Sequence, residues 1–375
     1  MQAQKISVVR LLVKATLIFV AVVLIFGVVN PMPVLGHLSL YNWMLPGRER
    51  LPYGDDPERS YTLNLYNLEA MFASLKLAGT PKAEDEFRVF VIGDSSVWGF
   101  LLERKDTLTG ALNAANLKTI SGWRVVFYNL GHPTISLTKD LMILDYAMQY
   151  DPDLIIWPVT LEAFPLSKQT SSPLVQNNAE RVRKLIHEFD LPIDPDNPDL
   201  VQPDFWDRTL IGQRRNLADI IRLQLYGFMW AATGIDVYIP DEIELRATDL
   251  EANEDFAGLQ PSELRTEDLA FDVLAAGILR ADGVPVLIIN EPIFVSNGAN
   301  SDTRYNSFYP RWAYDSYRGL LQEQSDQHGW IYADLWQAVD NSQFTNTPIH
   351  LTPQGTLELA DSIIAILHDQ FNLQP

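Results

Sequence analysis

Short apolar runs alternate with helically spaced apolar residues through most of the chain. Five runs are rich in β-branched or aromatic residues and are bounded by turn-forming residues, which is typical of buried strands. They lie at 87–92, 124–130, 154–159, 284–289 and 330–333. Helical periodicity appears at 137–150 and 312–328, and in a last helix that begins at Thr352-Pro353 and reaches about residue 368. Strands separated by helices predict an α/β fold whose parallel sheet is covered on both faces.

The alternation is interrupted between the third and fourth predicted strands. The interrupting segment, at about 161–264, has helical candidates at 180–189 and 205–230 and an acidic tract at 241–254. We interpret it as a helical insertion over one end of the sheet. Residues 217–235 are apolar enough to touch a membrane, but their broken charge pattern favours an ordinary packed helix.

A different apolar run lies near the N-terminus, at 15–29. It is short for a membrane span of about 20 residues, but it is long enough when counted from Ile6. Three basic residues and no acidic residue precede it: Lys5, Arg10 and Lys14. We therefore predict a single-pass anchor in the cell membrane, with the N-terminus inside and the body outside. The alternative is a cleaved signal peptide with a weak cleavage site at 34–36.

Three parts are expected along the chain. Residues 1–30 form a cytoplasmic stub and a transmembrane anchor. Residues 31–85 form a connecting region that is punctuated by prolines, with a helix at 63–77 packed on the body. Residues 86–375 form the α/β domain that carries the insertion.

Composition narrows the classes of function. The net charge is −20 and the isoelectric point is about 4.6. A nucleic-acid partner is not expected, because no basic face is available to neutralise phosphates. The chain has no cysteine, which excludes thiol catalysis, cysteine-ligated metals and disulfides. We expect neither a cofactor nor a metal ion.

Candidate chemistry begins at Gly93-Asp94-Ser95, where the first strand ends and a helical pattern starts. In an open α/β sheet, ligands bind at the carboxyl ends of the strands. A helix N-terminus there offers free N–H groups and a positive dipole end to a developing oxyanion. Ser95 is therefore a candidate nucleophile. The alternative is that Asp94 and Ser95 only cap the helix.

A serine nucleophile needs a base, and the chain has six histidines. His350 lies in the loop that enters the last helix, and this loop falls on the same rim of the sheet as Ser95. His368 is in the body of that helix, and His37 precedes the domain. His350 is therefore the candidate base, and a loop histidine bonded only to backbone is the alternative.

These residues match a known pattern. The segment from Gly93 to Gly99 resembles the first block, G-D-S-x-x-x-G, of the SGNH (GDSL-like) hydrolases. Asn129-Leu130-Gly131 resembles the second block, and His350 matches the histidine of the fifth. The resemblance implies a flavodoxin-like three-layer α/β/α fold and hydrolysis or transfer of an ester-linked acyl group. It implies that Ser95 is acylated, that His350 is the base, and that the N–H groups of Ser95 and Gly131 hold the oxyanion.

The chain departs from the family pattern in the oxyanion asparagine of the third block. The corresponding place reads Val159-Thr160-Leu161-Glu162. The Thr160 hydroxyl is one candidate replacement. Asn290, at the end of the fourth strand, is another, although an asparagine there also suits a turn.

The second departure concerns the acid that supports the histidine. The family aspartate lies three residues before the histidine, where this chain has Thr347, and Asn346 lies one position further back. An amide does not stabilise an imidazolium as a carboxylate does, and in a serine protease Asp-to-Asn costs about 10⁴ in rate. Asp340, Asp334 or a Ser–His dyad supported by backbone are alternatives to Asn346.

Two classes of function remain open. In the first, the chain is a membrane-tethered, outward-facing acyl-ester hydrolase or O-acyltransferase that acts on acylated cell-surface or extracellular glycans. In the second, it is a degenerate SGNH-like binding or scaffold partner. The family analogy suggests a membrane-bound O-acyltransferase as its partner.

Overall fold

A five-stranded parallel sheet forms the centre of the molecule. The computed structural model describes residues 7–54, 56–261 and 264–375. The strands are β1 (Glu86–Gly93), β2 (Arg124–Gly131), β3 (Leu154–Val159), β4 (Val286–Asn290) and β5 (Ile331–Asp334). Their order is β2-β1-β3-β4-β5 and every neighbouring pair is parallel. This is the flavodoxin-like order, and the predicted α/β class with a parallel sheet is confirmed.

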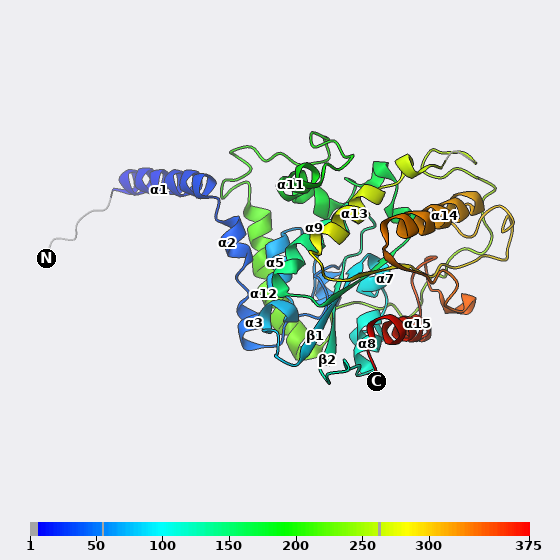
Figure 1. Cartoon of the computed structure of the whole chain (residues 1–375). Coiled ribbons are helices and arrows are strands. Elements are labelled where there is room, and N and C mark those ends of the chain that lie inside the picture. The colour runs from blue at the N-terminus through cyan, green and yellow to red at the C-terminus, as the bar shows by residue number, and fades with distance from the viewer. Residues whose placement is uncertain (1–6, 55, 262–263) are drawn as a thin grey trace.

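Helices cover both faces of the sheet (Figure 1). One face carries α9 (Leu137–Ala147), α13 (Phe271–Arg280) and α14 (Arg311–His328), and the other carries α8 (Leu108–Ala114) and α15 (Pro353–Phe371). The strands alternate accordingly. In β1, for example, Phe90 and Ile92 belong to the first apolar core, and Val89 and Val91 belong to the second. Each core is buried because successive strand residues point to opposite faces.

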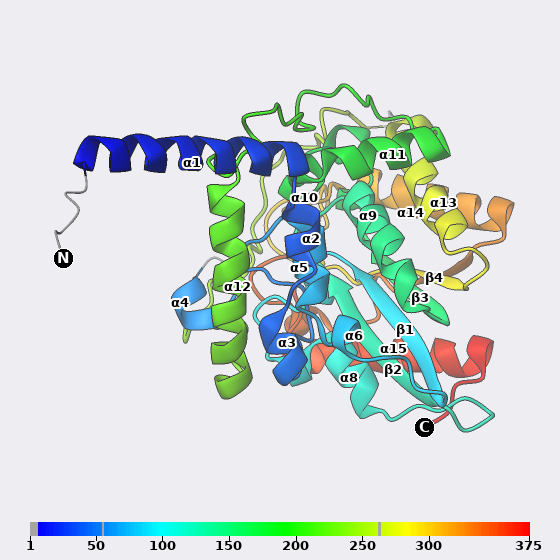
Figure 2. The same ribbon diagram turned by 90° about the vertical axis from the view of Figure 1, so that its left-hand side faces the viewer.

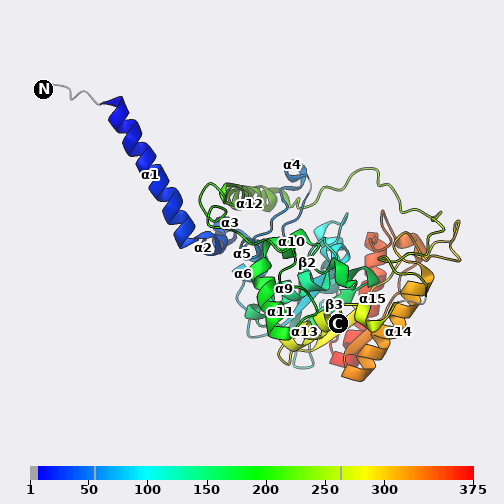
Figure 3. The same cartoon turned by 90° about the horizontal axis from the view of Figure 1, so that it is seen from above.

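The N-terminal helix α1 (Val8–Val29) extends away from the body (Figures 1 and 3). It has 22 residues with a hydropathy of 2.8, and most of it is not buried against the protein. Its length and composition suffice to cross a membrane. Ser7 accepts a hydrogen bond from the Arg10 N–H at its start, and Asn30 in the left-handed conformation ends it.

Short helices connect α1 to the sheet. They are α2 (Met32–Gly36), α3 (Leu40–Met44), α4 (Pro57–Ser60), α5 (Leu68–Ala73) and α6 (Lys76–Gly79). The single helix predicted at 63–77 is therefore wrong. The Ser74 carbonyl accepts bonds from the Tyr41 hydroxyl and the Arg48 N–H, and the Arg48 carbonyl accepts the Lys76 N–H. These tertiary bonds replace helical ones and separate α5 from α6.

The predicted insertion contains α10 (Pro173–Asn177), α11 (Ala179–Phe189) and α12 (Arg214–Thr233). The sequence places the start of α12 at 205, but it begins later. The Asp207 N–H donates to Asp204 Oδ1, and the Thr209 hydroxyl donates to the Trp206 carbonyl. These local bonds hold 204–209 in turns, which is a usual alternative to helix for Asp and Thr.

Candidate functional site

The first residue of a short helix at the sheet rim is Ser95. Gly93 ends β1, and Ser95 begins α7 (Ser95–Trp98). A Cβ on Gly93 would lie 2.7 Å from Val97 Cγ2, so only glycine fits this sharp turn. The cap of α7 is Asp94, whose Oδ1 accepts the Ser96 N–H at 2.8 Å. The Ser95 hydroxyl is thus left for another role.

Three predicted residues come together here. Ser95 Oγ lies 2.7 Å from His350 Nε2, and His350 Nδ1 lies 2.9 Å from Asn346 Oδ1. Because an amide oxygen only accepts, the imidazole proton sits on Nδ1. Nε2 then carries the lone pair and accepts the Ser95 hydroxyl proton. This is the tautomer that a general base needs.

The loop around His350 is closed by its own hydrogen bonds. The Thr345 N–H donates to the His350 carbonyl at 2.8 Å, and the His350 N–H donates to Thr347 Oγ1 at 3.1 Å. Thr347, at the position of the family aspartate, therefore shapes the loop rather than supporting the imidazole ring. The ring of Phe100 stacks on His350 with centroids 5.0 Å apart. His350 is 7% exposed, and its burial lowers its pKa to about 4.

The backbone N–H of Ser95 is the clearest donor to an oxyanion. As the first residue of α7 it has no acceptor within the helix. Gly131 differs from expectation, because its N–H donates to Asn129 Oδ1 at 3.0 Å. Gly131 instead allows α7 to approach β2, since a Cβ there would lie 2.4 Å from the Trp98 nitrogen.

The two replacements considered for the oxyanion asparagine form other bonds. Thr160 Oγ1 lies 2.8 Å from the Tyr309 hydroxyl. Asn290 Nδ2 donates to Asp334 Oδ1 at 2.8 Å, because β4 and β5 place these two residues side by side, and Asn290 Oδ1 faces Tyr314. Both side chains are thus bonded to neighbours other than Ser95, and their role at the oxyanion stays a prediction.

The other candidate acids are also engaged away from the histidine. Asp334 forms an ion pair with Arg318 at 2.6 Å, and Asp340 accepts the Ser342 N–H at 2.8 Å. Asn346 is therefore the residue that the structure places at His350 Nδ1.

A buried ionic cluster beneath Ser95 was not expected from the sequence. Lys139 Nζ donates to the carbonyls of Gly93, at 2.6 Å, and of His132, at 3.1 Å, and it pairs with Asp140 at 2.6 Å. Lys139 is fully buried. It therefore ties the end of β1 to the segment that follows β2. A Lys-Asp pair inside an otherwise apolar helical pattern was the available signal.

Glu291 adds a carboxyl group to this cluster. Its Oε2 accepts the Ser96 hydroxyl, and the side chain is buried directly after β4. Burial, together with the nearby Asp94, raises the pKa of Glu291 well above its usual range. This shift favours the neutral form of the carboxyl, whose hydrogen bond holds Ser96, the residue next to the nucleophile.

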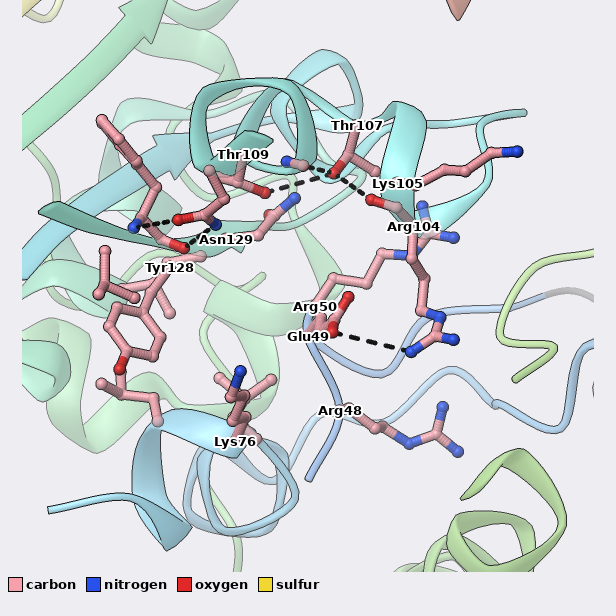
Figure 4. A pocket seen from close by; sticks show the side chains of 17 residues that line it. Arg48, Glu49, Arg50, Lys76, Arg104, Lys105, Thr107, Thr109, Tyr128 and Asn129 are labelled. Atoms are coloured by element: carbon pink, nitrogen blue, oxygen red, sulfur yellow. Dashed lines mark hydrogen bonds and ion pairs between the residues drawn. The ribbon is translucent and has the colours of Figure 1, made fainter. Parts of the chain in front are cut away.

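A cavity of about 430 Å³ lies against the outer edge of β2 (Figure 4). Lys76, Arg104 and Thr109 are among its lining residues, and Ser95 and His350 are not. The Ser95 site is thus separate from this cavity. Within residues 7–54, 56–261 and 264–375, no group of three His, Asp or Glu side chains is arranged to hold a metal ion.

The fold and site define a flavodoxin-like α/β protein with a Ser–His–Asn arrangement at the carboxyl rim of its sheet. No family model matches the sequence, and no curated protein matches it.

Solved structures with a similar chain course include a carbohydrate acetylesterase family member from Sinorhizobium meliloti. It is 12% identical and has a TM-score of 0.33, with 75% of this chain and 97% of that chain covered. A native aryl esterase from M. smegmatis is 10% identical and has a TM-score of 0.32, with 75% and 98% covered. At these values the likeness carries no conclusion about activity.

Proposed function

We propose that the chain is a membrane-anchored, outward-facing serine acyl-ester hydrolase or O-acyltransferase. The observation that carries the proposal is the line of contacts from Ser95 Oγ through His350 to Asn346, at 2.7 and 2.9 Å. Nucleophile, base and orienting group lie within hydrogen-bonding distance in the order that acyl transfer requires. The apolar helix α1 supports anchoring by a single pass, and the basic residues Lys5, Arg10 and Lys14 are the basis for proposing that the N-terminus is inside.

The first half-reaction forms an acyl-enzyme. Ser95 Oγ attacks the acyl carbon while its proton moves to His350 Nε2. The Ser95 N–H donates to the oxyanion of the tetrahedral intermediate. When the intermediate collapses, the ester C–O bond breaks and His350 returns the proton to the leaving alcohol. An acyl group is then attached to Ser95.

The second half-reaction removes the acyl group. A water or a sugar hydroxyl gives its proton to His350 and attacks the acyl carbon, and the Ser95 Oγ–acyl bond breaks with return of the proton to Ser95. Water as acceptor makes the chain an esterase, and a sugar hydroxyl makes it an O-acyltransferase. We propose acylated cell-surface or extracellular glycans as substrates, and a membrane-bound O-acyltransferase as a partner, by analogy with anchored proteins of the resembled family.

The test uses the purified full chain in detergent with p-nitrophenyl acetate. We expect a burst of p-nitrophenol and an acetylated peptide that contains Ser95. Ser95→Ala abolishes both. Because Ser96 is adjacent, Ser96→Ala is the matched control, and it still gives the adduct at Ser95. Absence of burst and adduct in the native chain contradicts the enzyme proposal.

A second candidate is a tethered scaffold with a degenerate site. It is favoured by the amide at the position of the acid and by the Gly131 N–H, which is already bonded to Asn129. An unreactive Ser95 in the experiment above, with the protein still folded, supports this role.

A further inference from the structure

Helix α12 has two apolar faces, and only one of them packs on the protein. The buried face consists of Ile220, Leu223, Gly227 and Trp230. The opposite face is exposed and consists of Ile221, Leu225, Phe228 and Met229. Ile221 is 60% exposed and Leu225 is 59% exposed. An ordinary packed helix has a polar outer face. The expectation of a packed helix therefore holds for the buried face of α12 but not for its exposed apolar face.

Helix α3 extends this apolar surface. A Cβ on Gly227 would lie 2.2 Å from Tyr41 Cδ1, so glycine lets the two helices touch. Gln224 joins them further, because its Oε1 accepts the Leu40 N–H at 2.8 Å and its Nε2 donates to the Leu38 carbonyl. Beside α12, α3 exposes Leu40, Trp43 and Met44. We call the exposed residues of α12 and α3 together the α3–α12 surface.

The position of α1 shows on which side of the body the α3–α12 surface lies. Gly27, near the end of α1, packs against Phe205 and Thr209, just before α12. α12 runs transverse to α1 (Figure 2). It also lies on the side of the body from which α1 extends (Figure 3). If α1 crosses a bilayer, α12 therefore lies along the bilayer surface.

The charge of α12 suits the same location. The helix carries Arg214, Arg215 and Arg222 but only one acidic residue, Asp219, in a chain whose net charge is −20. Long basic side chains next to an apolar face are typical of helices that lie in the interface of anionic membranes. Trp43 on α3 is a residue type enriched at that depth.

We propose that the α3–α12 surface rests in the headgroup region of the bilayer that α1 spans. The body is then held against the membrane by two contacts rather than by a flexible stalk. This inference rests on the anchoring of α1 in the proposed function, and it is independent of the chemistry at Ser95. Lipid therefore covers the α3–α12 surface. Contact of this surface with an integral membrane protein is the competing outcome of the test.

The absence of cysteine from the chain allows a direct test. Single cysteines replace Leu225 in α12, Val20 in α1 and Leu279 in α13, and each is labelled with a bimane. All three side chains are exposed, so the substitutions remove little packing. The full-length chain is reconstituted into vesicles of phosphatidylcholine and phosphatidylglycerol with or without nitroxide-labelled lipid.

We expect the labelled lipid to quench the probes at Leu225→Cys and Val20→Cys, and to leave Leu279→Cys near its unquenched intensity. Ile221→Cys, on the same face, repeats the measurement at a second position. Quenching at Val20→Cys without quenching at either α12 position overturns the inference and leaves the anchor intact. If the α12 probes are shielded only in native membranes, and labelled lipid does not quench them in these vesicles, the surface contacts a protein partner. This outcome also overturns the inference. Loss of quenching at Val20→Cys contradicts the anchor itself.

Discussion

Asn346 Oδ1 accepts a hydrogen bond from His350 Nδ1 at 2.9 Å, where the resembled hydrolases have a carboxylate. The amide orients the ring and selects the tautomer with the Nε2 lone pair facing Ser95. It adds no negative charge, however, so it does little for the imidazolium that forms during acyl transfer. The side chains are therefore correctly placed for acyl transfer, but Asn346 gives the protonated histidine little stabilisation.

Replacing Asn346 by aspartate should make the site faster. A hydrogen bond to a charged group is worth about 1–2 kcal/mol more than a neutral one, which corresponds to about tenfold in rate. We expect kcat for p-nitrophenyl acetate to rise by about tenfold in Asn346→Asp and to fall in Asn346→Ala. A rate in Asn346→Asp that is equal to or below that of the native chain would show that the supporting group lies elsewhere.

The activity should persist to unusually low pH. Burial lowers the pKa of His350 to about 4, so the imidazole stays neutral and able to accept a proton above that pH. We expect kcat/KM to fall on acidification with a midpoint near 4, and to be level at neutral pH. In Asn346→Asp the new carboxylate favours the imidazolium, so the midpoint moves to higher pH. A native midpoint near 6.5 would contradict the burial argument. The substrate alone at each pH is the blank.

Glu291 should tolerate a neutral isostere. Burial raises its pKa well above the usual range and so favours the neutral carboxyl, and its Oε2 accepts the Ser96 hydroxyl. Glu291→Gln keeps the shape and the acceptor, so we expect the melting temperature and the burst at Ser95 to stay close to native values. Glu291→Leu leaves the hydroxyl without its partner, at a cost of about 1–3 kcal/mol. Equal destabilisation by Gln and Leu would mean that the charge of Glu291 is needed.

The parts of the site that were predictable depend on topology alone. Parallel strands place their carboxyl ends on one rim, so a serine after β1 and a histidine before α15 were expected on the same rim. Their contact does not follow from topology, because β3 and β4 lie between β1 and β5. The direction of a side chain at the rim also requires the register between strands. Asn290 faces Asp334 because β4 and β5 pair in that register, and no local pattern in the sequence carries this information.

The insertion and the connecting region show the same limit. The helical periodicity of α12 was visible, but its exposed apolar face was not, because exposure depends on which elements pack nearby. The helix expected at 63–77 is divided because Tyr41 and Arg48, which are distant in sequence, take the hydrogen bonds of Ser74. Tertiary contacts of this kind override local propensity.

Lys139 should be the most sensitive position beneath the site. Its ammonium group joins the carbonyls of Gly93 and His132 and pairs with Asp140, all in a buried environment. Lys139→Met keeps the volume but leaves the Asp140 carboxylate without its counter-charge. Breaking a buried pair from one side costs about 3–5 kcal/mol, so we expect a much lower melting temperature and loss of the burst at Ser95. The measurement is thermal unfolding of the full chain in detergent, monitored by tryptophan fluorescence.

In the double variant Lys139→Met/Asp140→Asn the unpaired charge is removed, while the amide of residue 140 can still face Trp157. This variant should recover part of the stability. The burst should stay low, because no ammonium group donates to the Gly93 carbonyl. Full recovery of the burst would show that Lys139 only neutralises Asp140 and does not position the turn before Ser95.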